Sequence, residues 1–168
     1  MSVTSDAQAN DAHASGALIE QIAQVAEAYA RFVESLSPEA FHRRPGPDDW
    51  TAAEITGHVS EAPGTIAAHA VRVAETPGAA IGRPPDDPGR LAAVARLGDA
   101  GPAEGAQLVR RGIARACETL RGIPPEGWQA RGMHARSGEI TVAELVRTSI
   151  LEHLRGHLAQ ARAAAGPG

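Results

Sequence analysis

Apolar residues recur at steps of three and four along much of the chain, which is the spacing of one face of an α-helix. The first such run lies between residues 18 and 36 and consists of Leu18, Ile22, Val25, Tyr29, Phe32 and Leu36. Ser37 and Pro38 follow it with the residue types that favour the start of a further short helix. The pattern therefore predicts a long amphipathic helix, a break, and a short helical turn.

A second long helix is predicted between residues 51 and 75. Thr51 and Glu54 have the spacing of a capping box, and Trp50 stands just before them as a candidate staple residue. The apolar face then continues through Ile55, Val59, Ala62, Ile66 and Val73. Pro63 lies inside this helix and removes one backbone hydrogen bond, so we expect a kink there.

Two more helices are predicted in the second half of the chain. The third spans about residues 102–121, with an inner face of Leu108, Ile113, Ala116, Cys117 and Leu120. The fourth begins at a capping box of Thr141 with Glu144 and continues to about Ala165. Residues 76–102 are rich in Pro and Gly and are expected to contain one short helix at 90–97, and no segment has a strand pattern.

These elements predict an all-α fold, a four-helix bundle. Short loops join antiparallel neighbours, whereas a connection of about 25 residues can cross the length of a bundle. We therefore expect helices two and three to run parallel, in an up-down-down-up order with a long crossover, which leaves helices two and four antiparallel. Residues 1–14 are polar and aperiodic and are expected to be a disordered leader, and residues 15–168 to be a single domain.

Composition narrows the functional classes. The formal net charge is -4, and no block of Lys and Arg offers a surface for a phosphate backbone, so nucleic-acid binding is not expected. No apolar run approaches the ~20 residues of a membrane span, and the N-terminus lacks a signal pattern, so no membrane association is expected. The single cysteine, Cys117, rules out an intramolecular disulfide, and we expect a cytoplasmic protein.

Histidines supply the candidate chemistry. His153 and His157 lie one helical turn apart in LEHLRGHLAQ, so both imidazoles project from one side of the predicted helix and can reach one ion. The alternative is a packed or solvated helix face. His58, beside Val59 on the second helix, is the candidate third ligand.

The axial positions of these histidines agree with the predicted topology. By helical rise, His58 lies about 10 Å from the start of its helix, and the midpoint of His153 and His157 about 15 Å from the end of theirs. Antiparallel helices bring the three imidazoles level. His69 is on the same face as His58 but about 16 Å further along the axis, so it cannot share the ion and is expected to be packed or hydrogen-bonded.

Two stretches resemble the DinB-like (DinB/YfiT-like) superfamily of metal-dependent proteins. DDWTAAEITGHVSEA places a tryptophan before the helix that carries His58. ITVAELVRTSILEHLRGHLAQARAA contains the family's order of histidine, three residues, histidine, two residues, glutamine. The resemblance covers about residues 17–165.

This resemblance implies a bundle that holds a divalent metal through His58, His153 and His157, and it implies a homodimer. Some relatives use small thiols in transfer or isomerisation reactions, which makes a small-thiol cosubstrate an expectation. The mycothiol-dependent maleylpyruvate isomerase branch has glutamate where this chain has His153, so its particular reaction is not carried over.

Three neutral imidazoles would leave the double charge of one divalent ion in place and at least one coordination position open, as in catalytic zinc sites. Zinc is the favoured ion, with nickel or iron as alternatives. Glu61, one turn after His58, is the candidate general base; the alternative is a solvated or salt-bridged carboxylate. Gln160 is the candidate contact to a bound ligand; the alternative is a polar edge residue.

Three hypotheses follow for the function. The first is a metal-dependent enzyme acting on a small molecule, either a hydrolase or a transferase that activates a small thiol. The second is a metal- or small-ligand-binding bundle without turnover. The third is a helical interaction module whose core histidines bind no metal.

Overall fold

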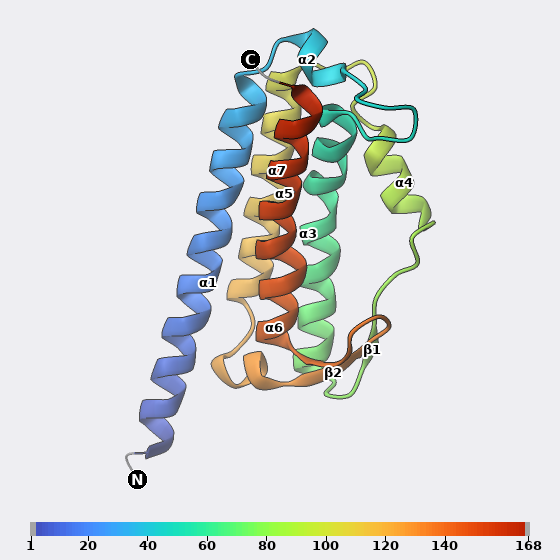
Figure 1. Ribbon diagram of the computed structural model, residues 1–168. Helices are drawn as coiled ribbons and strands as arrows, with labels where there is room; N and C mark the ends of the chain where they lie inside the picture. The colour runs from blue at the N-terminus through green and yellow to red at the C-terminus, as the bar shows by residue number, and fades with distance from the viewer. Residues whose placement is uncertain (1–2, 167–168) are drawn as a thin grey trace.

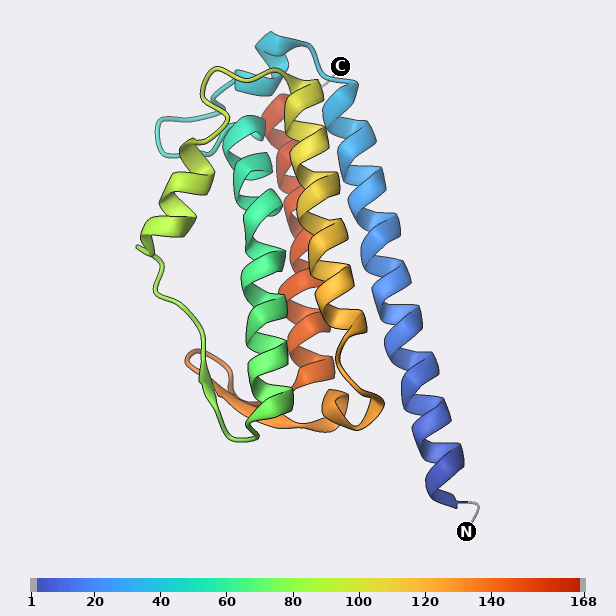
Figure 2. The same ribbon diagram turned by 180° about the vertical axis from the view of Figure 1, so that it is seen from behind.

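The structure, a computed structural model, describes the backbone of residues 3–166 and the side chains of residues 12–166. It is mostly helical and contains a small three-stranded sheet (Figures 1 and 2). The elements in chain order are α1 (Val3–Glu34), α2 (Pro38–His42), α3 (Ala52–Glu75), β1 (Ala80–Ile81), α4 (Pro88–Ala95), α5 (Pro102–Arg121), η1 (Pro125–Gln129), β2 (Arg131–His134), β3 (Gly138–Thr141), α6 (Val142–Val146), η2 (Arg147–Glu152) and α7 (His153–Ala165).

Four long helical segments lie side by side in both views: α1, α3, α5 and the continuous rod formed by α6, η2 and α7 (Figures 1 and 2). The chain leaves α3 at one end of the molecule and returns along its outside through residues 76–101, which include α4, before it enters α5. As a result α3 and α5 run in the same direction, while α7 runs against α3. This arrangement places the first half of α3 beside α7.

The ends of the helices follow the sequence signals closely. The side chains of Thr51 and Thr141 each accept a hydrogen bond from the backbone N–H three residues on. The carboxylates of Glu54 and Glu144 accept one from the backbone N–H of the capping threonine, so both predicted capping boxes are confirmed. Pro102 occupies the first turn of α5 as expected. The predicted short helix at 90–97 corresponds to α4, which begins at Pro88, with Asp87 as its capping residue.

The first helix starts earlier than its apolar pattern. The backbone of α1 is helical from Val3, whereas the predicted run of apolar positions begins at Leu18. The expected leader, residues 1–14, lies partly outside the described residues, and from Val3 onward it is helix rather than irregular chain. The division into a leader and a domain of residues 15–168 stays a prediction.

The sequence predicted no strands, and this prediction is wrong. β2 and β3 form an antiparallel hairpin, and β1 pairs with β2 in parallel. Gly138 opens β3 with a φ of 76°, a left-handed conformation that favours glycine. The strands have only two to four residues, which is too short for an alternation of buried and exposed positions to give a periodic signal in the sequence.

Helix packing depends on small residues at close contacts. An ideal Cβ on Gly112 of α5 would overlap the carbonyl oxygen of Ser60 of α3, and one on Gly57 of α3 would overlap the carbonyl oxygen of Ala93 of α4. The absence of a side chain at these two positions lets α5 and α4 approach the backbone of α3. Because Gly57 directly precedes His58, this contact places α4 next to the backbone of that histidine.

In the part of the chain that the structure describes, none of the helices combines the length and the apolar character that a membrane span requires.

Candidate metal site

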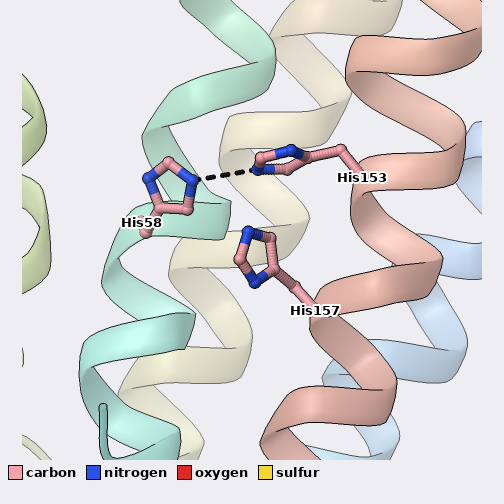
Figure 3. A group of neighbouring side chains, drawn as sticks. All are labelled: His58, His153 and His157. Atoms are coloured by element: carbon pink, nitrogen blue, oxygen red, sulfur yellow. Dashed lines mark hydrogen bonds between the residues drawn. The ribbon is translucent and has the colours of Figure 1, made fainter. Parts of the chain in front are cut away.

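The three predicted histidines converge between α3 and α7. His58 projects from α3, and His153 and His157 project toward it from successive turns of α7 (Figure 3). Each offers one ligand atom such that these atoms all lie within 4.8 Å of one another. His58 is only 4% exposed, whereas His153 and His157 are half-buried, so the cluster has one closed side and one side toward solvent.

The ring nitrogens of His58 and His153 are within hydrogen-bond distance. The two Nε2 atoms are 2.9 Å apart, so one must carry a proton when they bond to each other. The rings of His153 and His157 have centroids 4.3 Å apart, and both stand edge to face with the His58 ring at 5.1 and 5.0 Å. The three rings thus surround one small volume.

Gln160 orients one of the three rings. Its Oε1 accepts a hydrogen bond of 2.7 Å from Nδ1 of His157, one helical turn away. Because an amide oxygen can only accept, Nδ1 carries the proton, and Nε2 is then the nitrogen with a free lone pair. A metal-binding histidine ordinarily donates its second N–H to a fixed acceptor in this way. The expected contact of Gln160 to a bound ligand stays a prediction.

Burial keeps the cluster uncharged at neutral pH. Burial, together with the charges of the other two histidines, lowers the pKa of His58 to about 3. Burial and the His157 charge lower the pKa of His153 to about 4, and burial also lowers the pKa of His157 against the opposing effect of Gln160. Neutral imidazole is the form that binds a metal.

A wide helical turn directly precedes the two histidines of α7. Residues 147–152 form η2, a π-helix between α6 and α7. An extra residue in a turn rotates the following helix by about 100° relative to a regular α-helix. η2 therefore sets which residues of α7 face α3: Leu154, Leu158 and Ala161 enter the core, and His153 and His157 face His58.

The donor set fits a divalent transition metal. Two imidazole nitrogens bound to one tetrahedral ion at about 2.0–2.1 Å lie about 3.4 Å apart, so small side-chain rotations from the observed spacing are sufficient. Nδ1 of His58 is buried and has no hydrogen-bond partner among the described residues, so only the Nε2 side of this ring has a polar contact, with His153. Three nitrogen ligands suit zinc, nickel or iron.

Glu61 lies near the cluster but is held by an arginine. Arg83 donates two hydrogen bonds to its carboxylate, of 2.6 and 2.8 Å, and Thr65 donates one of 2.7 Å. Partial burial opposes ionisation of Glu61, but the bonds from Arg83 and Thr65 outweigh it and lower its pKa. The sequence left two roles open for Glu61, a salt-bridged carboxylate and a general base. The structure contains the salt bridge, with Arg83, and the role of general base stays a prediction.

The remaining histidine on α3 is separate from the cluster. His69 is half-buried, its Nδ1 has no hydrogen-bond partner among the described residues, and it is not one of the three grouped histidines. The choice of His58 over His69 as the residue that meets His153 and His157 therefore agrees with the structure.

Three residues beside the cluster were not singled out as site residues by the sequence. The Trp50 ring stands edge to face with the His58 ring at 5.6 Å, although the sequence indicated this tryptophan only as a candidate staple residue. Arg83 and Arg90 come from the connection between α3 and α5, and their charges contribute to the lowered pKa values of His58 and His153. Residues 76–101 have no periodic pattern, so the sequence does not indicate which of their side chains contact α3.

Two hollows in the surface lie elsewhere. One is lined by residues of α1, the end of α5 and η1, including Trp128, and the other runs between α1 and α5 past Arg110 and Cys117. Neither includes any of the three histidines. The chemistry of the imidazole cluster, rather than the shape of the surface, makes it the candidate site.

Comparison with known proteins supports the same region. The family model of the DinB superfamily matches residues 21–161, which include all three histidines and Gln160. Neither the curated proteins nor the solved structures that were compared gave a match.

Proposed function

The chain belongs to the DinB superfamily, and from this we propose that it is a metal-dependent enzyme that acts on a small molecule at His58, His153 and His157. The observation that carries the proposal is the convergence of three neutral imidazoles from two helices, with ligand atoms within 4.8 Å. The reaction we propose is hydrolysis or transfer to a small thiol. The up-down-down-up four-helix bundle is part of the proposal and is supported by the course of the helices in Figures 1 and 2.

The residues of the chain have distinct proposed roles. His58, His153 and His157 would hold one divalent ion, which when bound can lower the pKa of a water or thiol or polarise a carbonyl group. Gln160 fixes the tautomer of His157. Glu61, kept ionised and in place by Arg83, is the proposed proton acceptor, and Thr65 supports its position.

Several details of the proposal depend on metal chemistry, the family and the composition rather than on the structure. Zinc is favoured because three nitrogen ligands and an open position are its usual catalytic arrangement, with nickel or iron as alternatives. A small-thiol cosubstrate, a homodimer and a cytoplasmic location follow from the family resemblance and the composition.

The second candidate is a metal- or small-ligand-binding protein without turnover. The observation that favours it is the state of Glu61, whose carboxylate accepts two hydrogen bonds from Arg83 and one from Thr65 and is therefore not free to act as a base. Under this alternative the three histidines still bind metal, but substitution of Glu61 changes nothing that can be measured except stability.

Metal content tests the proposal first. Elemental mass spectrometry of the purified chain is expected to find about one divalent ion per molecule, and this ion should be lost in His58→Ala and in His153→Ala. His13→Ala, a substitution of an exposed histidine on α1, is the matched control and should retain the metal. A wild-type chain that binds no zinc, nickel or iron would overturn the proposal. If metal is bound and a reaction is found, Glu61→Gln should slow turnover without loss of metal.

A further inference from the structure

Helix α4 packs against α3 at Gly57, the residue that directly precedes His58. Gly57 allows the backbone of Ala93 to lie directly against α3, and Ala93 is buried at this contact. The capping bond from the Arg90 backbone N–H to Asp87, 2.9 Å long, fixes the start of α4. The position of α4 relative to His58 is therefore set by backbone packing and not by a flexible loop.

Arg90 connects α4 to the histidines through Trp50. Its guanidinium carbon lies 5.7 Å from the centroid of the Trp50 ring, in a cation–π arrangement. The same indole stands against the ring of His58 at 5.6 Å. The three side chains form a row from the arginine to the metal-binding cluster.

The two arginines of this region differ in their partners. Arg83 is neutralised by Glu61 and by Asp87, which accepts a bond of 3.2 Å. Arg90 donates one hydrogen bond to the carbonyl oxygen of Pro85, and no ion pair with a carboxylate is found for it among the described residues. This half-buried guanidinium, which lies against Trp50, thus has several N–H donors that no carboxylate among the described residues accepts from.

The charge of Arg90 is felt throughout the cluster. It contributes to the lowered pKa of each of the three histidines, in agreement with the contacts that link the guanidinium to His58 through Trp50. A divalent ion held by neutral histidines would add to this positive charge. Such a surrounding attracts an anion, and a planar guanidinium matches the two oxygens of a carboxylate.

We propose that Arg90, supported by Trp50 and seated by the contact of α4 with Gly57, is a carboxylate-binding subsite beside the three histidines. The substrate class is therefore a small molecule with a carboxylate group close to its reacting centre. This inference rests on the proposed function for its link to a reaction, but the subsite itself can be tested without metal.

Acetate is the probe, and the two tryptophans supply the readout. Acetate is titrated at constant ionic strength into metal-free and zinc-loaded protein, and the indole N–H signals of Trp50 and Trp128 are followed by NMR. Trp128, in η1 near the opposite end of α3, is the internal control. Acetamide, a neutral molecule of the same shape, is titrated in parallel. The variants are Arg90→Gln and, as a matched control, Arg96→Gln on an exposed position at the end of α4.

We expect acetate to shift the Trp50 signal and not that of Trp128, and Arg90→Gln to raise the dissociation constant of acetate about tenfold or more. Arg96→Gln should leave the constant unchanged, and acetamide should bind weakly to all forms. Equal acetate affinity in Arg90→Gln and wild type, or no saturable shift at Trp50, overturns the subsite. Acetate binding that depends on Arg90 in a chain that binds no zinc would keep the subsite and overturn the proposed function instead.

Discussion

The tautomer of His157 is fixed by a single neighbour three residues away. The bond from its Nδ1 to Gln160 both orients the ring and directs the free lone pair of Nε2 toward His58 and His153. His58 has no comparable acceptor among the described residues. The rings of the cluster are therefore oriented unequally, and the orientation of His157 depends on Gln160, an exposed residue.

Replacement of Gln160 by alanine is expected to weaken metal binding about tenfold, because His157 loses the acceptor that selects its tautomer. Competition with a chromophoric chelator measures the affinity. Gln107→Ala, a substitution of an exposed glutamine on α5, is the control and should not change it. Identical affinities for Gln160→Ala and wild type would show that the hydrogen bond does not support the site.

At the scale of the elements, close contacts between helices occur at glycines and determine how α3, which carries His58, is placed against its neighbours. Gly112 lets α5 reach the backbone of α3 at Ser60, two residues after His58. Gly64 of α3 differs, because an ideal Cβ there would meet no atom within 4 Å. Substitution of these two glycines can therefore separate two effects: loss of the close helix contact at Gly112, and gain of helix propensity when glycine is replaced by alanine at Gly64.

Gly112→Ala is expected to lower the free energy of unfolding by about 1–3 kcal/mol, since α3 and α5 must move apart to accept the methyl group. Gly64→Ala is expected to raise it by about 0.5–1 kcal/mol, since alanine favours the helix and the site has room. Urea denaturation followed by circular dichroism measures both. Similar effects of the two substitutions would argue against the tight contact at Ser60.

The elements also show where sequence reasoning succeeds and where it stops. Helix α5 and both capping boxes could be predicted to the residue, because their signals are local. On α1 the core face includes Ala26, Ala30 and Val33, while the larger Val25 and Phe32 are only partly buried, because helices that approach closely prefer small residues. The predicted Leu18, Ile22 and Tyr29 are fully part of this core, so the pattern of large apolar residues found the face but not its small members.

The site shows the same division. The three histidines could be predicted because two share one helix turn and the third follows from an antiparallel neighbour. The π-helical turn before His153 and the approach of Arg90 depend on small shifts in register or on tertiary packing. No local pattern in the sequence marks them.

At the scale of the whole molecule, a charged clamp joins α1 to α5. Arg110 donates hydrogen bonds to both Glu27 and Glu34, and Arg31 adds a bond to Glu27. Hydrogen bonds from Arg110 and then Arg31 lower the pKa of Glu27 to about 2. Because the folded pKa lies below the ordinary value near 4.5, the clamp stabilises the fold fully above that value and loses its contribution as the pH falls toward 2.

Glu27→Gln should therefore lower the midpoint of urea unfolding at pH 7, and the difference from wild type should shrink between about pH 4.5 and pH 2. Unfolding midpoints measured across this range test the expectation. Glu118→Gln, a substitution of an exposed glutamate on α5, should show no such pH-dependent difference. A constant difference between Glu27→Gln and wild type at all pH values would contradict the role of the ionised carboxylate.

The long return connection has a consequence for how this protein can evolve. The histidines lie on α3 and α7, whose packing is shared with the core, whereas Arg83 and Arg90 lie on residues 76–101, outside the helices that carry the metal ligands. Under the proposed function, substitutions of the exposed side chains in this connection would alter the molecules that the site accepts without changing the helices that carry the histidines. Selection could thus diversify specificity in one segment while the proposed reaction centre is retained in another.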